Sequence, residues 1–443
     1  MNADLSSLLI AGSGAILFAT AALVLLVRGD LAPAGLRPLA LSTGGRVLLG
    51  AALGLGVIAF TIKVVIILTL SSFPGQTIAP LIASVGQGGE RDLTPLPRPE
   101  PPPYEWKGLP LAVPAPPDNP TTAAKAVLGE KLFHDTALSS DRTVSCATCH
   151  DVHDGVGTDG RATAIGVTGI PGARNAPTVW NAAYQARLFW DGRAGSLEEQ
   201  ALGPPLNPDE MGMPSLAAIE QRIAENPAYA PLFVQAFGDG ATITAQRAAQ
   251  AIAAYERTLV ATDTAYDRFV AGDDTALTAA QQRGMWLFQS SGCVMCHSGP
   301  IFSGASLVGP KNPYAPLFAD RSAVARPYGL TADSGRAPAG QRGIWRIPSL
   351  RNVALTAPYF HNGAVDDLRE AVRIMATSQL NAVIADDDRA ARAPRWLAER
   401  RRFAAPERLV LTPRDIDDMA DFLRALSSDT LIARGNRPRG DRQ

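Results

Sequence analysis

The sequence carries almost no net charge and few cysteines. Its 443 residues include 41 basic and 42 acidic side chains, so overall charge favours neither a nucleic acid nor another strongly charged partner. All four cysteines fall in the two motifs described next, which leaves none for a structural disulfide or a thiol nucleophile. An apolar content of 46% excludes a disordered chain and supplies enough material for hydrophobic cores.

Two copies of one pentapeptide dominate the sequence. Residues 146–150 read Cys-Ala-Thr-Cys-His, and residues 293–297 read Cys-Val-Met-Cys-His. C-x-x-C-H is the pattern of c-type haem attachment, in which two thiols bond to the porphyrin and the adjacent His binds iron. A redox thiol pair or half of a zinc site explains one C-x-x-C, but not two copies that are each followed by His. The sequence therefore predicts two haem c groups, bound by Cys146, Cys149 and His150 and by Cys293, Cys296 and His297.

Two long apolar segments precede these motifs. Residues 8–27 contain no charged side chain and residues 47–70 contain one, Lys63. Each segment is long enough to cross a hydrocarbon core about 30 Å thick, and the first lacks the basic start of a cleavable signal peptide. Arg28, Arg37 and Arg46 place the loop between the segments in the cytoplasm. These features predict a two-pass protein of the bacterial inner membrane with its haem domains in the periplasm.

The rest of the chain divides at changes in composition. Residues 71–120 are rich in proline and predict a linker. Residues 121–278 and 279–430 predict two cytochrome c-like haem domains, mainly α-helical with long loops, and residues 431–443 predict a disordered basic tail. Apolar spacing and capping residues predict helices over 121–132, 244–258, 279–289, 368–376 and 413–425.

The second axial position of each iron decides whether the haem is reactive or carries electrons. His153 lies only three residues from His150, too close to reach the far face easily, and His134 precedes the motif and is expected to be packed or solvated. The first iron is therefore expected to be open. For the second iron, Met375 lies on a downstream amphipathic segment, and it can serve equally as a ligand or as part of the core.

Long stretches of the chain resemble the bacterial di-haem cytochrome c peroxidase and MauG family, from about residue 128 to residue 426. The matching stretches are Leu128-Gly-Glu-Lys-Leu-Phe133, Arg174-Asn-Ala-Pro-Thr178, Trp190-Asp-Gly-Arg193, Glu210-Met211 and Thr356-Ala-Pro-Tyr-Phe-His-Asn-Gly363. The resemblance implies that Glu210 is the distal acid–base residue of the first haem, and that Gln200 and Pro204 line the peroxide pocket. It also places Trp190 between the two haems as an electron relay.

The resemblance further implies a role for four residues outside that pocket. Met375 matches the methionine that ligates the second iron, and Asn175, Thr356 and Pro358 match positions that bind a calcium ion between the domains. Oxygen ligands suit such a hard cation.

The sequence also departs from the family pattern. Many family peroxidases carry a His after an Ile-Gly dipeptide, where it ligates the first iron until the other haem is reduced; here Val167 follows Ile165-Gly166. MauG-type members share an open first iron but have Tyr where Met375 stands. We therefore expect a first iron that is open even when oxidised, together with a second haem of the peroxidase type.

These observations predict an enzyme that reduces hydrogen peroxide at the first haem. Its electrons would come from a periplasmic cytochrome c, a cupredoxin or a quinol, through the second haem. Two alternatives stay open: a MauG-like enzyme that oxidises side chains of a partner protein, and a non-catalytic di-haem electron carrier. A homodimer is compatible with the sequence.

Overall fold

The computed structural model describes residues 104–153, 155–309, 311–317, 323–385 and 409–435. The predicted segments 8–27 and 47–70 lie outside these residues. The longest described helices have 12 residues, which is about 18 Å of helix against a hydrocarbon core of about 30 Å. No described helix is therefore long and apolar enough to cross a membrane. On this finding we correct the predicted two-pass location in the inner membrane with periplasmic haem domains, and we do not retain it.

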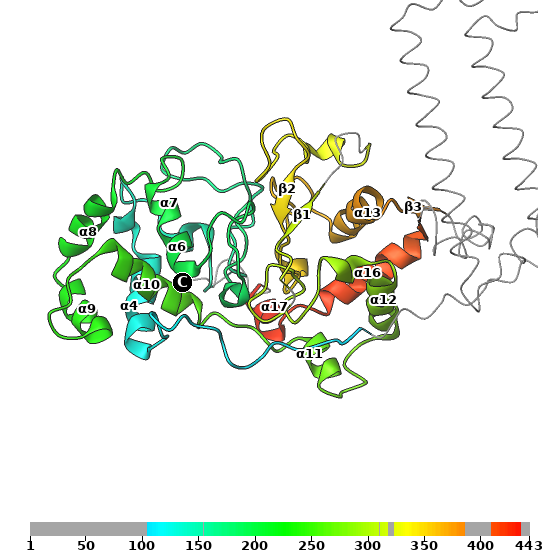
Figure 1. Ribbon diagram of the computed structural model, residues 1–443, viewed down its shortest axis with the longest axis horizontal. Coiled ribbons are helices and arrows are strands. Elements are labelled where there is room, and N and C mark those ends of the chain that lie inside the picture. The colour runs from blue at the N-terminus through cyan, green and yellow to red at the C-terminus, as the bar shows by residue number, and fades with distance from the viewer. Residues whose placement is uncertain (1–103, 154, 310, 318–322, 386–408, 436–443) are drawn as a thin grey trace, which may run out of the picture. The chain divides into compact units, whose positions relative to one another are not determined.

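The mainly helical fold predicted from the sequence is confirmed, and Figure 1 shows its two halves side by side. The first half holds α4 (Ala123–His134), α5 (Cys146–Cys149), α6 (Leu197–Ala201), α7 (Gly203–Leu206), α8 (Leu216–Ala224), α9 (Tyr229–Phe237) and α10 (Ala245–Glu256). Short 3₁₀ turns lie at Thr136–Leu138 and Ala182–Tyr184.

The second half holds α11 (Ala265–Val270), α12 (Ala279–Ser290), α13 (Leu368–Gln379) and α16 (Pro413–Arg424), followed by α17 (Asp429–Gly435). Its 3₁₀ turns are Cys293–Met295, Arg326–Tyr328 and Val353–Leu355. Strands β1 (Tyr314–Pro316) and β2 (Ile344–Arg346) pair antiparallel, with Ala315 opposite Trp345. Strands β3 (Val383–Ile384) and β4 (Val410–Leu411) pair in parallel.

Each half is built on one close helix crossing. Helix α4 crosses α10 at Gly129, where an added Cβ would lie 1.9 Å from the carbonyl oxygen of Ala251. Helix α12 crosses α16 at Gly284, where an added Cβ would lie 1.8 Å from the carbonyl oxygen of Asp418. Only glycine lets the backbones approach this closely. Helix α4 precedes the first haem motif in sequence, and α12 precedes the second. Each motif therefore follows a helix that makes one of these close crossings.

Residues 104–120, which composition assigns to the linker, pack on both halves. Trp106 contacts the core of the second half, which includes Tyr266, Phe302 and Phe422. Further along, the amide of Asn119 donates to Glu198 in the first half at 2.6 Å. The segment appears in Figure 1 as the cyan trace that runs between the halves along the lower edge. We call residues 104–120 the strap.

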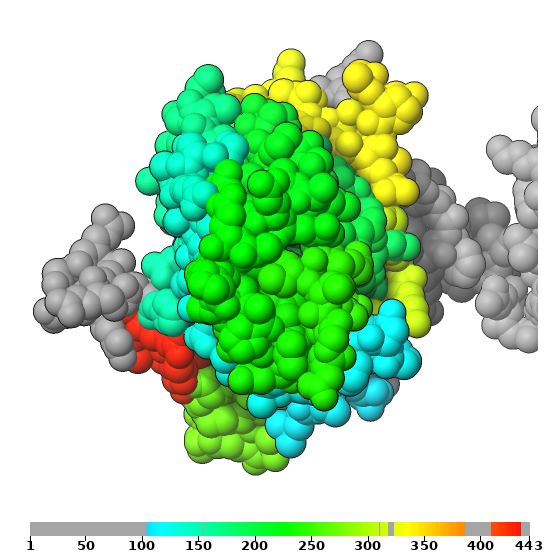
Figure 2. All heavy atoms as spheres, turned by 90° about the vertical axis from the view of Figure 1, so that its left-hand side faces the viewer, coloured from blue at the N-terminus to red at the C-terminus, as the bar shows by residue number. Residues whose placement is uncertain are grey.

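The chain end also returns to the first half. Residues 431–435, which the sequence assigns to a disordered basic tail, form the second part of α17. Leu431 is fully buried in the core of the first half, and Arg434 donates to the carbonyl oxygen of Val152 at 2.8 Å. The buried leucine and this hydrogen bond hold the end of the chain against the first half. Figure 2 looks onto the first half and shows the red C-terminal residues at its edge.

The helix crossing gives a stability prediction. Gly129→Ala should lower the free energy of unfolding by about 1–3 kcal/mol, because the new methyl group overpacks the crossing. Gly435→Ala is the control, since no atom lies within 4 Å of a Cβ at that position. Chemical unfolding followed by circular dichroism measures both, and equal stability of the two variants would contradict the close crossing.

Candidate active site

The first haem motif forms a single helical turn that points its His into the protein. The backbone N–H of Ser145 donates to the Thr148 hydroxyl at 2.9 Å at the start of α5. The backbone N–H of His150 donates to the Cys146 carbonyl at 2.9 Å and closes the turn. The Nδ1 of His150 lies 3.3 Å from the carbonyl oxygen of Gly157. This bond leaves Nε2 as the iron ligand, and burial lowers the pKa of the ring so that it stays neutral.

The second motif repeats this arrangement. The backbone N–H of His297 donates to the Cys293 carbonyl at 2.9 Å, and Nδ1 lies 3.0 Å from the carbonyl oxygen of Phe302. Burial again lowers the pKa of the imidazole. Both histidines are therefore held as neutral ligands with Nε2 available, which is the state that haem iron requires.

The cysteines fit thioether attachment better than any competing use. None of the four is paired with another cysteine. Burial, the largest cause, raises the pKa of Cys146 and Cys293 to about 12, so these thiols are neutral and unsuited to be thiolate nucleophiles. Among the described residues, no group of three or more His, Cys, Asp or Glu side chains could hold a free metal ion. The residues present fit two c-type haems.

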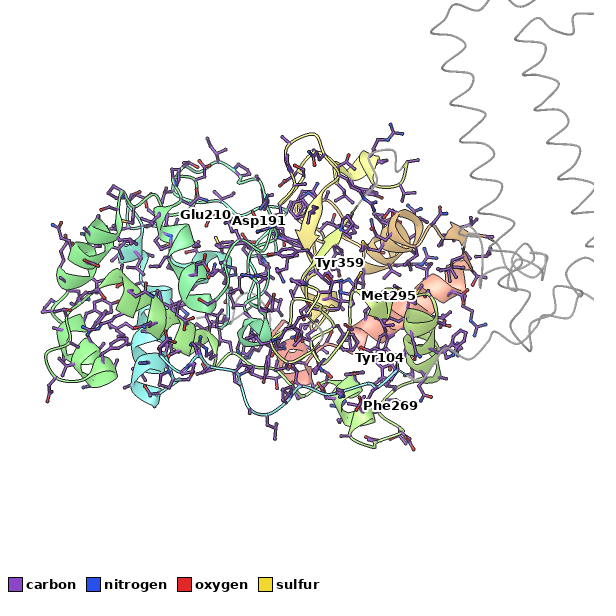
Figure 3. The ribbon with its side chains drawn as sticks, in the orientation of Figure 1. Tyr104, Asp191, Glu210, Phe269, Met295 and Tyr359 are labelled. Atoms are coloured by element: carbon purple, nitrogen blue, oxygen red, sulfur yellow. The ribbon has the colours of Figure 1, made fainter. Side chains whose placement is uncertain are left out.

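Glu210 lies in the turn after α7, within electrostatic reach of the first motif. Its negative charge contributes to the raised pKa values of Cys146 and Cys149, after the larger effect of burial. The Asn207 amide donates to Glu210 Oε1 at 2.7 Å. Burial nevertheless raises the pKa of the Glu210 carboxyl above its ordinary value, because it outweighs that hydrogen bond. Figure 3 labels Glu210 in the first half.

The loop that contains Val167 lies directly against Glu210. The backbone N–H of Val167 donates to the Glu210 carbonyl at 2.9 Å. At Gly166 an added Cβ would lie 2.1 Å from the Asp209 carbonyl oxygen, so the loop could not approach with any other residue. The structure thus places the Val167 position beside Glu210.

Gln200 and Pro204 flank the same turn from α6 and α7, and both are half-buried. The carbonyl oxygen of Pro204 accepts a hydrogen bond from the backbone N–H of Asn207 at 3.2 Å. Because Asn207 in turn binds Glu210, Pro204 helps to position that carboxylate through one intervening residue. The structure shows no such link for the Gln200 side chain among the described residues.

Trp190 lies where the two halves meet. Its indole N–H donates to the Asn175 carbonyl at 2.8 Å, and its own carbonyl accepts from the backbone of Arg346 in β2 at 3.0 Å. The Trp190 ring stands 6.5 Å from the ring of His361, which stacks on Trp345 at 4.1 Å. Burial lowers the pKa of His361 to about 4, so the ring stays neutral. The sequence did not predict this stack, because no spacing pattern relates residues so far apart.

An ion network closes the same junction. Arg174 pairs with Asp191 at 2.7 Å and with Asp333 at 2.8 Å. All three side chains are half-buried, and the pKa values of both carboxyls lie below their ordinary values, since the Arg174 hydrogen bonds outweigh burial. The network joins residues of the two halves around Trp190.

Met375 lies on α13 and is half-buried against the core of the second half. Cys293 and Phe302, on either side of His297 in sequence, belong to or pack on the same core. Met375 and the second motif therefore contact the same core, which is compatible with the predicted ligation of the second iron by Met375.

Two of the three predicted calcium ligands, Asn175 and Thr356, have hydrogen-bond partners. The Asn175 amide donates to the Arg161 carbonyl at 2.9 Å, and the backbone N–H of Asn175 donates to the His361 carbonyl at 2.7 Å. The Thr356 hydroxyl donates to Val353 at 3.1 Å, and Pro358 follows a cis peptide bond. Because His361 lies three residues after Pro358, its hydrogen bond with Asn175 makes the segment around Asn175 a neighbour of the segment around Pro358.

Comparisons with known proteins agree with this geometry. The family model described as di-haem cytochrome c peroxidase matches residues 123–275. The chain is 41% identical over 281 residues to cytochrome c peroxidase Ccp of Escherichia coli, a match over 62% of this chain and 58% of that protein. It is 40% identical over 285 residues to cytochrome c551 peroxidase of Pseudomonas aeruginosa, covering 61% of this chain and 76% of that protein.

A MauG protein and a solved structure are similar as well. Methylamine utilization protein MauG of Methylophilus methylotrophus is 37% identical over 275 residues, covering 61% of this chain and 78% of that protein. The crystal structure of a MauG-like protein associated with microbial copper homeostasis superposes with a TM-score of 0.58 at 29% identity. That match covers 76% of this chain and 99% of the other.

A buried carboxyl group near the first motif was not predicted from the sequence. Glu256, at the end of α10, is 4% exposed, and its Oε2 has no hydrogen-bond partner among the described residues. Burial raises the pKa of Glu256 to about 8, in spite of the neighbouring Arg257. Arg257 itself donates to Glu198 at 2.6 Å. Glu256 is therefore a neutral acid at pH 7, and no periodicity of the sequence distinguishes it from a surface glutamate.

The buried Glu256 carboxyl group should make the free energy of unfolding depend on pH. The stability that this neutral acid contributes is fully present below its ordinary pKa of 4.5 and is lost as pH rises to about 8, because the unfolded chain releases the proton first. Glu256→Gln should flatten this decline, whereas Glu130→Gln on the exposed side of α4 should keep it. Urea unfolding across that pH interval measures the slopes. If the unfolding free energy of Glu256→Gln fell with pH as steeply as that of the wild-type protein, this would mean that Glu256 is ionised in the folded protein.

Proposed function

Because the chain belongs to the di-haem cytochrome c peroxidase/MauG family and binds two c-type haems, we propose that it reduces hydrogen peroxide to water. The first half is the peroxide site in this proposal, and the second half receives the electrons. The observation that carries the proposal is Glu210, a half-buried carboxyl with a raised pKa beside the first motif. A carrier of electrons alone would have no use for such a group.

Reduction of peroxide breaks the O–O bond and consumes two electrons and two protons to form two molecules of water. A haem held by Cys146, Cys149 and His150 would supply the iron and the electrons that this reduction requires. The Glu210 carboxylate accepts the proton from the oxygen that remains bound and donates it to the oxygen that leaves. Asn207 holds Glu210 Oε1 at 2.7 Å, which leaves the other carboxylate oxygen for this transfer. Gln200 is proposed to donate to the charge that develops.

Electrons are proposed to arrive at the second half from a small cytochrome c, a cupredoxin or a quinol. Met295 supports this assignment, because it lies within the second motif and 80% of its surface is exposed. Figure 3 shows Met295 in the second half, away from Glu210. Met375 is the proposed second ligand of that iron, and His/Met ligation raises the reduction potential in a way that suits an electron acceptor. Trp190 is the proposed relay between the halves.

Similarity alone does not separate peroxidases from MauG proteins, since both kinds of relative are close to 40% identical. Met375 favours the peroxidase, because MauG-type members resemble this chain elsewhere but have Tyr at that position. The calcium ion at Asn175, Thr356 and Pro358 and the homodimer stay predictions.

Glu210→Gln tests the proposed acid–base role. Removing the carboxylate should lower peroxide turnover by about 100-fold or more, because the amide that replaces it cannot accept and donate the proton. Asp209→Asn is a matched control, since Asp209 is the adjacent carboxylate and is exposed. Stopped-flow absorbance with hydrogen peroxide and a reduced donor measures both. An unchanged rate in Glu210→Gln would contradict the role, as would an equal loss in Asp209→Asn.

Val167→His tests the proposed open iron. The backbone of residue 167 is held beside Glu210, so an imidazole at this position should ligate the first iron and convert its spectrum to low-spin in the oxidised protein. Peroxide should then react only after one electron has been added, whereas the wild-type protein and Val167→Leu should react at once. A wild-type protein that is already low-spin at both haems would contradict the open site.

A further inference from the structure

The loop after the second motif is held at every residue from Gly299 to Phe302. The backbone N–H of Gly299 donates to the hydroxyl of Tyr104 at 2.8 Å. Arg351 Nε donates to the Pro300 carbonyl at 2.8 Å, and the Ser349 hydroxyl donates to the Ile301 carbonyl at 2.7 Å. The Phe302 carbonyl accepts the hydrogen bond of His297 at 3.0 Å. Three of these four contacts therefore fix the loop whose last carbonyl orients the iron ligand.

The contact at Gly299 comes from the strap and not from the haem domain itself. Tyr104 is half-buried, and burial raises the pKa of its phenol, so the hydroxyl stays neutral. Its ring packs on Trp106 at 4.6 Å in an edge-on arrangement. Trp106 in turn lies 6.1 Å from the Phe302 ring and 5.7 Å from the Phe422 ring. The strap thus touches both ends of the loop, through a hydrogen bond at Gly299 and an aromatic contact at Phe302.

Neighbouring contacts hold this part of the strap in place. The Tyr266 hydroxyl donates to the Lys107 carbonyl at 3.1 Å. The backbone N–H of Leu109 lies 3.4 Å from a carboxylate oxygen of Asp267. Asp267 also pairs with the fully buried guanidinium of Arg351, which holds Pro300. The strap and the loop therefore share the same set of supporting side chains.

The first haem motif is supported by α17 and not by the strap, because Arg434 donates to the carbonyl oxygen of Val152, two residues after His150, at 2.8 Å. The Gly157 carbonyl that accepts from His150 lies in a loop fixed within the first half, by Gly157 N–H to Asp151 at 2.7 Å and by Val179 N–H to Gly157 at 3.2 Å. His150 is also held less closely, at 3.3 Å against 3.0 Å for His297. The two motifs therefore provide an internal comparison for any effect of the strap.

We propose that Tyr104 and Trp106 are positioning residues for His297, and that they set the reduction potential of the second haem. A hydrogen bond from Nδ1 to a carbonyl makes the imidazole a stronger donor to iron, which stabilises the oxidised state and lowers the potential. Without Tyr104, the Gly299 N–H loses its acceptor, the loop relaxes and the Phe302 carbonyl moves away from His297. The inference rests on haem attachment at the second motif and is independent of the proposed peroxidase activity.

Tyr104→Phe is the test, with Tyr184→Phe as the matched control. Each variant removes one hydroxyl from a hydrogen bond that involves the strap: the Tyr104 hydroxyl accepts from the Gly299 N–H at 2.8 Å, and the Tyr184 hydroxyl donates to the Pro110 carbonyl at 2.8 Å. Only the Tyr104 hydroxyl binds the loop. A spectroelectrochemical titration of the full chain with both haems attached measures each potential. We expect the second haem of Tyr104→Phe to shift to a more positive potential, with the first haem unchanged and both haems unchanged in Tyr184→Phe.

Proton NMR of the reduced, low-spin second haem gives a second measurement that does not depend on activity. A weaker hydrogen bond from the Nδ1–H of His297 should shift the resonance frequency of that proton upfield in Tyr104→Phe, and Trp106→Leu should change it in the same direction. Unchanged potentials and frequencies in both variants would overturn the proposal. Equal shifts at the two haems, or the same shift in Tyr184→Phe, would also overturn it, because they would show that the strap supports the fold without acting on His297.

Discussion

A glycine that faces the carbonyl oxygen of a crossing helix sets the geometry of each half. At Gly129 and Gly284 the crossing backbones come so close that no side chain fits between them. The helix that contains each glycine leads to a C-x-x-C-H turn, so the crossing decides where the two thiols and the His stand relative to the core. The functional groups of the two halves, from Glu210 to Tyr104, each lie near one of these two C-x-x-C-H turns.

The two halves share this frame but differ in what surrounds it. Around the first motif the structure gathers groups that can move or hold protons: Glu210 with its Asn207 partner, and the neutral acid Glu256. Around the second motif it gathers aromatic rings, the buried pair of Arg351 and Asp267, and the thioether of Met375. Proton transfer needs titratable groups near water, whereas electron transfer needs a rigid, apolar setting that changes little with oxidation state. The contrast supports proton transfer in the first half and electron transfer in the second.

Local signals in the sequence predicted the parts that depend on neighbours in the chain. The helix start at Thr278 and the Pro413 helix with its Thr412 cap are both observed, because capping is decided within four residues. The strap and α17 were not predicted as packed segments. Proline-rich and arginine-rich compositions indicate little regular hydrogen bonding, yet Trp106 and Leu431 each pack on a core and help to anchor their segments. Likewise, the stack of His361 on Trp345 depends on tertiary structure that no local pattern encodes.

The position of α17 has a consequence for the order in which the protein is completed. Leu431 belongs to the core of the first half, although it comes after every other described helix of the chain. A ribosome releases the first half more than a hundred residues before it releases that leucine. The half that is synthesised first is therefore the half that is finished last, and cutting the chain between the two haem domains would leave the first without a piece of its own interior.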